Sequence, residues 1–158
     1  MEKAIDEIIT LQRKFFADGA TRATAFRLDA LTKLRKAVRE RTDALSEALR
    51  EDLNKSAGES YLTEIGLVMQ ELECHIRHLK RWSRSRRVST PLTLWPSRSR
   101  IRPEPLGVAL IVAPWNYPVQ LLVCPLVGAI SAGNCVLLKS SPLVPHVEAA
   151  LRDLIAET

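Results

Sequence analysis

The sequence has 158 residues, of which 46% are hydrophobic and 26% are charged, with a formal net charge of +5 at pH 7. This composition is ordinary for a globular domain and excludes a disordered chain. The apolar stretches at 108–112 and 119–130 are too short or too interrupted by Pro and Gly to cross a bilayer, so we expect no membrane span.

The first half of the chain has the apolar periodicity of amphipathic helices. Four helices are predicted over residues 1–83: the first ends at Asp18-Gly19, the second begins near Thr21, the third is capped by Thr42 and ends near Asn54, and the fourth runs from about Glu59 to Ser83. The side chains predicted to face the core include Phe26, Leu28, Leu31, Leu34, Val38, Leu45, Leu49, Leu53, Leu62, Ile65, Val68, Met69, Leu72, Ile76 and Leu79.

Residues 84–105 have a different composition: Arg and Ser alternate with apolar residues, and four prolines interrupt this pattern. This pattern predicts a short two-stranded hairpin with an exposed edge. The region is also strongly basic, because no acid occurs between Glu73 and Glu104.

From Gly107 the order is strand (GVALIVA), turn (PWNYP), helix ending at Gly133, strand (NCVLLK), turn (SSP) and a last helix. Two apolar strands joined by a helix predict a parallel βαβ unit, and the fold class is therefore α/β. Because a parallel pair buried on both faces needs further strands, we expect the chain to be the first part of something larger.

The three cysteines, Cys74, Cys124 and Cys135, have no CxxC spacing and lie in apolar surroundings. The N-terminus lacks the features of a secretory signal. We therefore expect buried, reduced thiols in a cytoplasmic protein.

Two turns follow the carboxyl ends of the predicted strands, where doubly wound sheets bind ligands: Trp115-Asn116-Tyr117 and Lys139-Ser140-Ser141. An Asn amide on a rigid turn can donate to an oxyanion, and a Lys at a strand end can bind ribose hydroxyls or phosphate. Taken singly, each residue also fits an ordinary turn or a solvated strand end.

The motifs EPLGV, PWNYP, PLVGAISAGN and VLLK, in this order, resemble the aldehyde dehydrogenase superfamily, in particular the class 3 branch of fatty and aromatic aldehyde dehydrogenases. The resemblance covers essentially the whole chain and implies NAD(P)-dependent oxidation of aldehydes to carboxylic acids. It implies an N-terminal helical segment at 1–83, a bridging hairpin at 84–105, and the start of a Rossmann-like dinucleotide-binding domain at 106–158.

On this pattern Asn116 matches the residue that stabilises the oxyanion, and Tyr117 lies on the substrate side. The positions implied for NAD or NADP binding are Pro114, Trp115, Lys139 and Ser140. Family members commonly have K-P-S-E where this chain has Lys139-Ser140-Ser141-Pro142. Without that carboxylate beside the ribose, we predict a shift toward NADP.

The family's nucleophilic cysteine and general-base glutamate lie beyond position 158, and neither Cys124 nor Cys135 matches them. The resemblance thus implies the N-terminal part of such an enzyme, as a truncated or split gene product or as one piece of a complementing pair. We expect this part to be inactive alone and to associate with a complementing chain or as a homo-oligomer.

Two other functions fit parts of the sequence. Residues 77–102 could bind nucleic acid or an acidic partner, with arginines on phosphates and Trp82 and Trp95 stacking on bases. The favoured interpretation is that these arginines cover a subunit or domain surface and the tryptophans pack, so no nucleic acid is expected. Cys74, His75 and His78 could be metal ligands on one helix, but they lack a fourth ligand. These histidines, like His146, are therefore predicted to be solvated.

Overall fold

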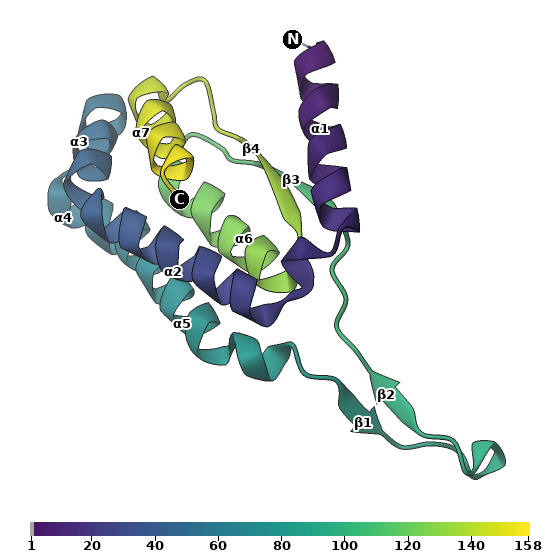
Figure 1. The fold of residues 1–158 in the computed structure, drawn as a ribbon. Helices are drawn as coiled ribbons and strands as arrows, with labels where there is room; N and C mark the ends of the chain where they lie inside the picture. The colour runs from purple at the N-terminus through teal and green to yellow at the C-terminus, as the bar shows by residue number, and fades with distance from the viewer. Residues whose placement is uncertain (1) are drawn as a thin grey trace.

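The computed structural model describes residues 2–158 (Figure 1). Its longer helices are α1 (Glu2–Ala17), α2 (Thr24–Glu40), α3 (Thr42–Leu53), α5 (Gly66–Trp82), α6 (Pro118–Ala132) and α7 (Pro145–Ala156). The one-turn helix α4 (Ala57–Ser60) runs into a π-helical turn, Tyr61–Ile65, and short 3-10 turns occupy Ala20–Arg22 and Leu92–Leu94. The strands are β1 (Arg86–Val88), β2 (Ser99–Ile101), β3 (Val108–Val112) and β4 (Cys135–Lys139). No described helix combines the length and apolar character needed to span a membrane.

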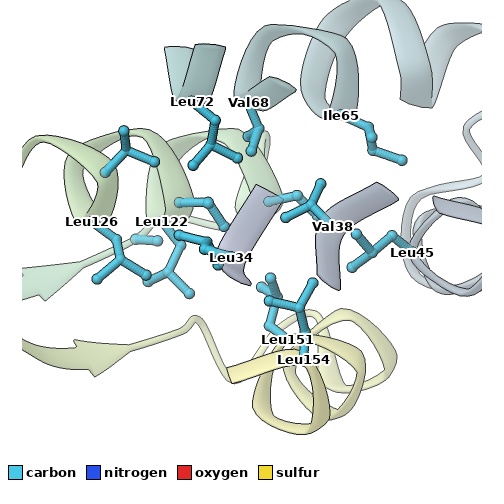
Figure 2. Packing of buried hydrophobic residues seen from close by; sticks show 14 of the residues in the cluster. Leu34, Val38, Leu45, Ile65, Val68, Leu72, Leu122, Leu126, Leu151 and Leu154 are labelled. Atoms are coloured by element: carbon cyan, nitrogen blue, oxygen red, sulfur yellow. The ribbon is translucent and has the colours of Figure 1, made fainter. Parts of the chain in front are cut away.

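Helix α6 lies at the centre of the packing, which explains why its sequence is apolar on nearly every face. It contacts α2 and α5 on one side and β3 and β4 on the other. Figure 2 shows Leu122 and Leu126 of α6 within the cluster that includes Leu34, Leu72 and Leu151. These side chains are at most 5% exposed, so the helical half and the βαβ unit share one hydrophobic core.

Strands β3 and β4 pair in parallel, in a register that runs from Val108 opposite Cys135 to Val112 opposite Lys139. Helix α1 contacts this pair as well, and the Gln12 Nε2 group donates to the Val136 carbonyl oxygen at 2.8 Å. Gly133 ends α6 with a φ of 90°, a conformation that favours glycine. The predicted βαβ unit and the α/β class are therefore confirmed.

The predicted hairpin is also present, because β1 and β2 pair antiparallel and project away from the helices (Figure 1). All three residues of β1 are exposed, and Trp95 between the strands is 79% exposed. Within residues 2–158 Trp95 does not pack, because the hairpin extends beyond the core that could cover it, and its packing at a subunit surface stays a prediction.

Other details differ from the sequence prediction. Phe26 and Leu62 are 43% and 75% exposed rather than buried. Phe26 lies against Phe15 with ring centroids 6.0 Å apart, and Leu62 belongs to the π-helical turn, whose wider winding breaks the 3.6-residue period. Thr42 does not cap α3: only Arg41 separates α2 from α3, and the Thr42 hydroxyl donates back to the Val38 carbonyl oxygen at 3.1 Å.

Candidate functional site

The two turns singled out in the sequence begin on neighbouring strands at the same edge of the sheet. The Ala113 N–H donates to the Lys139 carbonyl oxygen at 3.0 Å, which joins the ends of β3 and β4 directly. Pro114, Trp115, Asn116 and Tyr117 are all exposed. Within residues 2–158, the Asn116 side-chain amide has no hydrogen-bond partner, so it is available to a ligand.

A buried ion pair contacts this turn from the side of the core, and the sequence did not predict it. Lys55 is 8% exposed and Glu64 is fully buried. The Lys55 Nζ group lies 2.6 Å from Glu64 Oε1 and also donates to the Asn116 carbonyl oxygen at 3.0 Å. The same ammonium sits over the Tyr117 ring, 4.2 Å from its centroid. One cation therefore contacts two of the three residues of the turn.

Glu64 completes the support by capping the helix that follows the turn. Pro118 is the first residue of α6 and has no N–H, and Glu64 Oε2 accepts from the Val119 and Gln120 N–H groups at 2.8 and 3.2 Å. A carboxylate is favourable at a helix N-terminus because it satisfies free N–H groups and faces the positive end of the helix dipole. The cap comes from 55 residues earlier in the chain.

The backbone that presents Glu64 depends on Gly66. The Gly66 N–H donates to the Tyr61 carbonyl oxygen, which is the five-residue spacing of a π-helix. A Cβ atom at position 66 would stand 2.8 Å from that same oxygen. The turn therefore requires glycine because of close approach rather than unusual dihedral angles.

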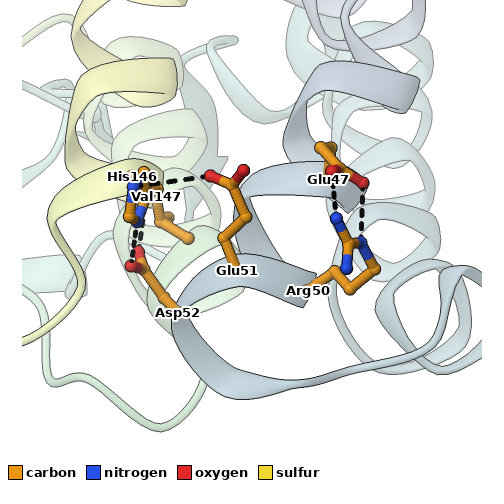
Figure 3. A network of polar contacts seen from close by, with 6 residues as sticks. All are labelled: Glu47, Arg50, Glu51, Asp52, His146 and Val147. Atoms are coloured by element: carbon orange, nitrogen blue, oxygen red, sulfur yellow. Dashed lines mark hydrogen bonds and ion pairs between the residues drawn. The ribbon is translucent and has the colours of Figure 1, made fainter.

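The second junction, between β4 and α7, is capped in a similar way (Figure 3). Asp52 Oδ2 accepts from the Val147 N–H at 2.8 Å, and Asp52 Oδ1 lies 2.7 Å from His146 Nδ1. Glu51 approaches the other ring nitrogen at 3.5 Å. The hydrogen bond to Asp52 raises the pKa of His146 above its ordinary value, assisted by the charges of Glu51 and Asp52. His146 is exposed, as predicted, but it is bound to this pair rather than simply solvated. A Glu47–Arg50 pair lies on the next turn of α3 (Figure 3).

Lys139 is exposed at the end of β4, and its ammonium has only a long contact of 3.5 Å to the Ser140 carbonyl oxygen. Among the described residues it forms no ion pair. Ser141 is buried, and its hydroxyl accepts from the Leu143 N–H at 3.3 Å. Of the three residues Lys139-Ser140-Ser141, Lys139 is therefore exposed to solvent and Ser140 is partly exposed.

The cysteines are free, and they are partly buried, which is less burial than the sequence predicts. Burial raises the pKa of Cys124 to about 11 and also raises the pKa of Cys135. Both thiols are therefore protonated at neutral pH, whereas a nucleophilic cysteine must be a thiolate.

The prediction that His75 and His78 are solvated is wrong. His75 Nδ1 lies 2.6 Å from Ser131 Oγ of α6, and its Nε2 lies 2.9 Å from Glu71. Trp82 packs on both imidazoles, with centroids 5.0 and 5.4 Å away. Both histidines lie where α5 packs beside the end of α6, and their spacing indicates packing rather than ligation. In the described part of the chain no group of three or more His, Cys, Asp or Glu residues could hold a metal ion.

The sequence gives only a weak indication of the Lys55–Glu64 pair. Glu64 stands next to Ile65 and four residues before Val68, both fully buried, so an acid occurs where the helix faces the core. An acid on such a face needs a partner. Nothing in the sequence identified Lys55 as that partner, and nothing linked Asp52 to α7.

Comparison with known proteins gives one consistent result. The aldehyde dehydrogenase family model matches residues 1–158. The chain is 42% identical over 146 residues to 4,4'-diaponeurosporen-aldehyde dehydrogenase of Staphylococcus aureus, covering 92% of this chain and 32% of that protein. It is 43% identical to mouse aldehyde dehydrogenase family 3 member B2, covering 92% of this chain and 30% of that protein.

A solved structure described as the substrate-bound state of Staphylococcus aureus AldH superposes with a TM-score of 0.95 at 41% identity, covering 98% of this chain and 34% of the solved one. A GapN structure from Methanocaldococcus jannaschii, complexed with NADP, has 20% identity and a TM-score of 0.76, covers 97% of this chain and 34% of that one, and shows the fold alone. The chain thus spans about a third of the length of its relatives. It belongs to the aldehyde dehydrogenase family, corresponds to the N-terminal part of that fold, and has family 3 members among its relatives.

Proposed function

We propose that the protein is an NAD(P)-dependent aldehyde dehydrogenase and that residues 1–158 supply its oxyanion donor and part of its cofactor rim. The net reaction converts an aldehyde, water and NAD(P)⁺ into a carboxylic acid, NAD(P)H and a proton. The observation that carries the proposal is the exposed Asn116 amide, free of protein partners, on a turn whose backbone is fixed by Lys55 and Glu64. Asn116 is the residue assigned to the developing oxyanion, because a preorganised amide stabilises charge that appears there. Tyr117 is assigned to the substrate side of the same turn.

The residues at the sheet edge fit a dinucleotide. Lys139 presents an ammonium free of carboxylates, and Ser140 adds a partly exposed hydroxyl beside it. Pro114 and Trp115 supply an exposed apolar surface on the adjoining turn, suited to a nicotinamide ring. When bound, NAD(P) supplies the hydride acceptor. The missing carboxylate after β4 supports a shift toward NADP, because the 2′-phosphate would meet Lys139 rather than a negative charge.

Residues 1–158 alone are proposed to be inactive, because neither Cys124 nor Cys135 matches the position of the family's nucleophile, and burial raises the pKa of both thiols. The nucleophile would then come from other residues of the complete protein or from a complementing chain. The division into segments 1–83, 84–105 and 106–158 and a cytoplasmic location remain part of the proposal.

The test is NADP- and NAD-dependent oxidation of a panel of aliphatic and aromatic aldehydes by the protein expressed from its complete gene. Asn116→Ala is expected to lower kcat about 10²–10³-fold with KM changed much less. A kcat within twofold of the wild type would contradict the role of Asn116, and absence of oxidation with every aldehyde would contradict the enzyme assignment. A kcat/KM that is higher with NAD than with NADP would contradict the cofactor preference.

A second candidate function is binding of nucleic acid or an acidic partner by the basic segment, residues 77–102. The observation that favours it is the hairpin, where Trp95 and the arginines of β1 are exposed. Retention on a nucleic-acid column that falls with salt and is lost in an Arg84, Arg86 and Arg87 triple alanine variant would support it. Elution at low salt, unchanged in that variant, would dismiss it.

A further inference from the structure

The Lys55–Glu64 pair is placed to do more than fill space in the core. Replacing a buried ion pair with apolar residues of similar volume is often neutral or stabilising, so stability alone is a weak reason for charges here. Each charge contacts the backbone around Asn116: Lys55 the carbonyl oxygen of that residue, and Glu64 the first N–H groups of the following helix.

We propose that Lys55 and Glu64 are positioning residues for Asn116, and that they fix the backbone at the oxyanion donor and directly after it. This inference rests on the proposed function. Lys55 pulls the Asn116 carbonyl oxygen toward the core at 3.0 Å, and Glu64 holds Val119, three residues later, at 2.8 Å. The 2.6 Å contact between the two charges links these anchors into one unit. Because the backbone is held at Asn116 and again three residues later, the Asn116 side chain has little freedom to move.

The arrangement gives a specific kinetic expectation. A group that positions a catalytic donor contributes to the stabilisation of the transition state, because a misplacement of the donor by about 1 Å can lower the rate about 10²-fold. Removing the Lys55 ammonium should therefore lower kcat, whereas KM for the aldehyde should change little. Glu64 should behave in the same way, since it anchors the backbone directly after the turn.

The decisive experiment is a double-mutant cycle between Lys55→Met and Asn116→Ala in the protein expressed from its complete gene. Lys55→Met alone is expected to lower kcat about 10- to 100-fold. In the Asn116→Ala background the same change should lower kcat less than about twofold, because the donor that Lys55 positions is already absent. Lys55→Arg keeps a donor and a cation and should recover part of the lost kcat.

The matched control is Asp52→Asn, which alters the carboxylate that caps α7 and does not contact the Asn116 turn. Whatever the size of its effect, the fold-change in kcat of the double variant Asp52→Asn with Asn116→Ala should equal the product of the two single fold-changes. If Lys55→Met is also multiplicative with Asn116→Ala, or leaves kcat unchanged in a folded protein, the inference is overturned while the proposed function stands. If the wild type oxidises no aldehyde, the proposed function fails and this inference fails with it.

Glu64→Gln gives an independent structural readout if the kinetic variants fold poorly. Amide hydrogen exchange of Val119 and Gln120 should accelerate in Glu64→Gln and in Lys55→Met, and the turn residues 115–117 should become more mobile. Unchanged exchange at all of these positions in both variants would refute the positioning role of Lys55 and Glu64.

Discussion

The two strand-to-helix junctions of the βαβ region are capped by the same kind of group in different surroundings. At the β3–α6 junction the cap is the fully buried Glu64, paired with the 8% exposed Lys55. At the β4–α7 junction the cap is Asp52, whose partner is the exposed, titratable His146. In both, a carboxylate from the helical half of the chain accepts from the first turn of a helix that begins with proline. The N-terminal helices therefore hold both junctions, one through a buried ion pair and one through a carboxylate paired with a titratable histidine.

The largest expected loss follows from breaking the buried junction. Glu64→Ala leaves the Lys55 ammonium without its carboxylate and two N–H groups of α6 without an acceptor. The free energy of unfolding should fall by about 3–5 kcal/mol. Urea unfolding followed by circular dichroism measures this, and a loss below about 1 kcal/mol would show that water replaces the carboxylate.

Gly66→Ala should weaken the same junction indirectly, through the position of Glu64. Because a Cβ atom at position 66 would stand 2.8 Å from the Tyr61 carbonyl oxygen, the π-helical turn must shift and carry Glu64 with it. We expect a loss of about 1–3 kcal/mol, typical of overpacking. Gly58→Ala is the matched control, because nothing lies within 4 Å of its added methyl group. Equal stability of both variants would show that the close approach carries no cost.

Asp52→Ala removes the cap of the second junction. The expected loss is about 1 kcal/mol, in the usual range for a helix cap. The same urea titration measures it. A loss as large as that of Glu64→Ala would erase the distinction between the two junctions.

The smallest effect is the pH dependence contributed by His146. Because its folded pKa is raised, the His146–Asp52 contact stabilises the fold fully below the unfolded pKa of about 6.5 and loses its effect as the pH rises through the folded value. His146→Gln should therefore lower Tm at pH 5.5 and leave it unchanged at pH 8.5. A Tm difference that grows with pH would reverse the assigned direction of the shift.

The order of elements and the placement of the turns could be predicted because they depend on local patterns. The apolar runs of β3 and β4, the prolines around Asn116 and the glycine after α6 each act within a few residues. The supports of the site could not be predicted in this way. Lys55 reaches Asn116 across 61 positions and Asp52 reaches Val147 across 95, and no local pattern encodes such contacts.

The capping of α6 by Glu64 has a consequence for the order of folding. Helix α6 begins with Pro118 and draws its N-terminal acceptor from 55 residues earlier, so its first turn completes only after the segment around the π-helical turn is in place. During synthesis from the N-terminus, α2 to α5 emerge first and can associate before α6 leaves the ribosome. The earlier helices then serve as a template on which the central helix of the core is laid down.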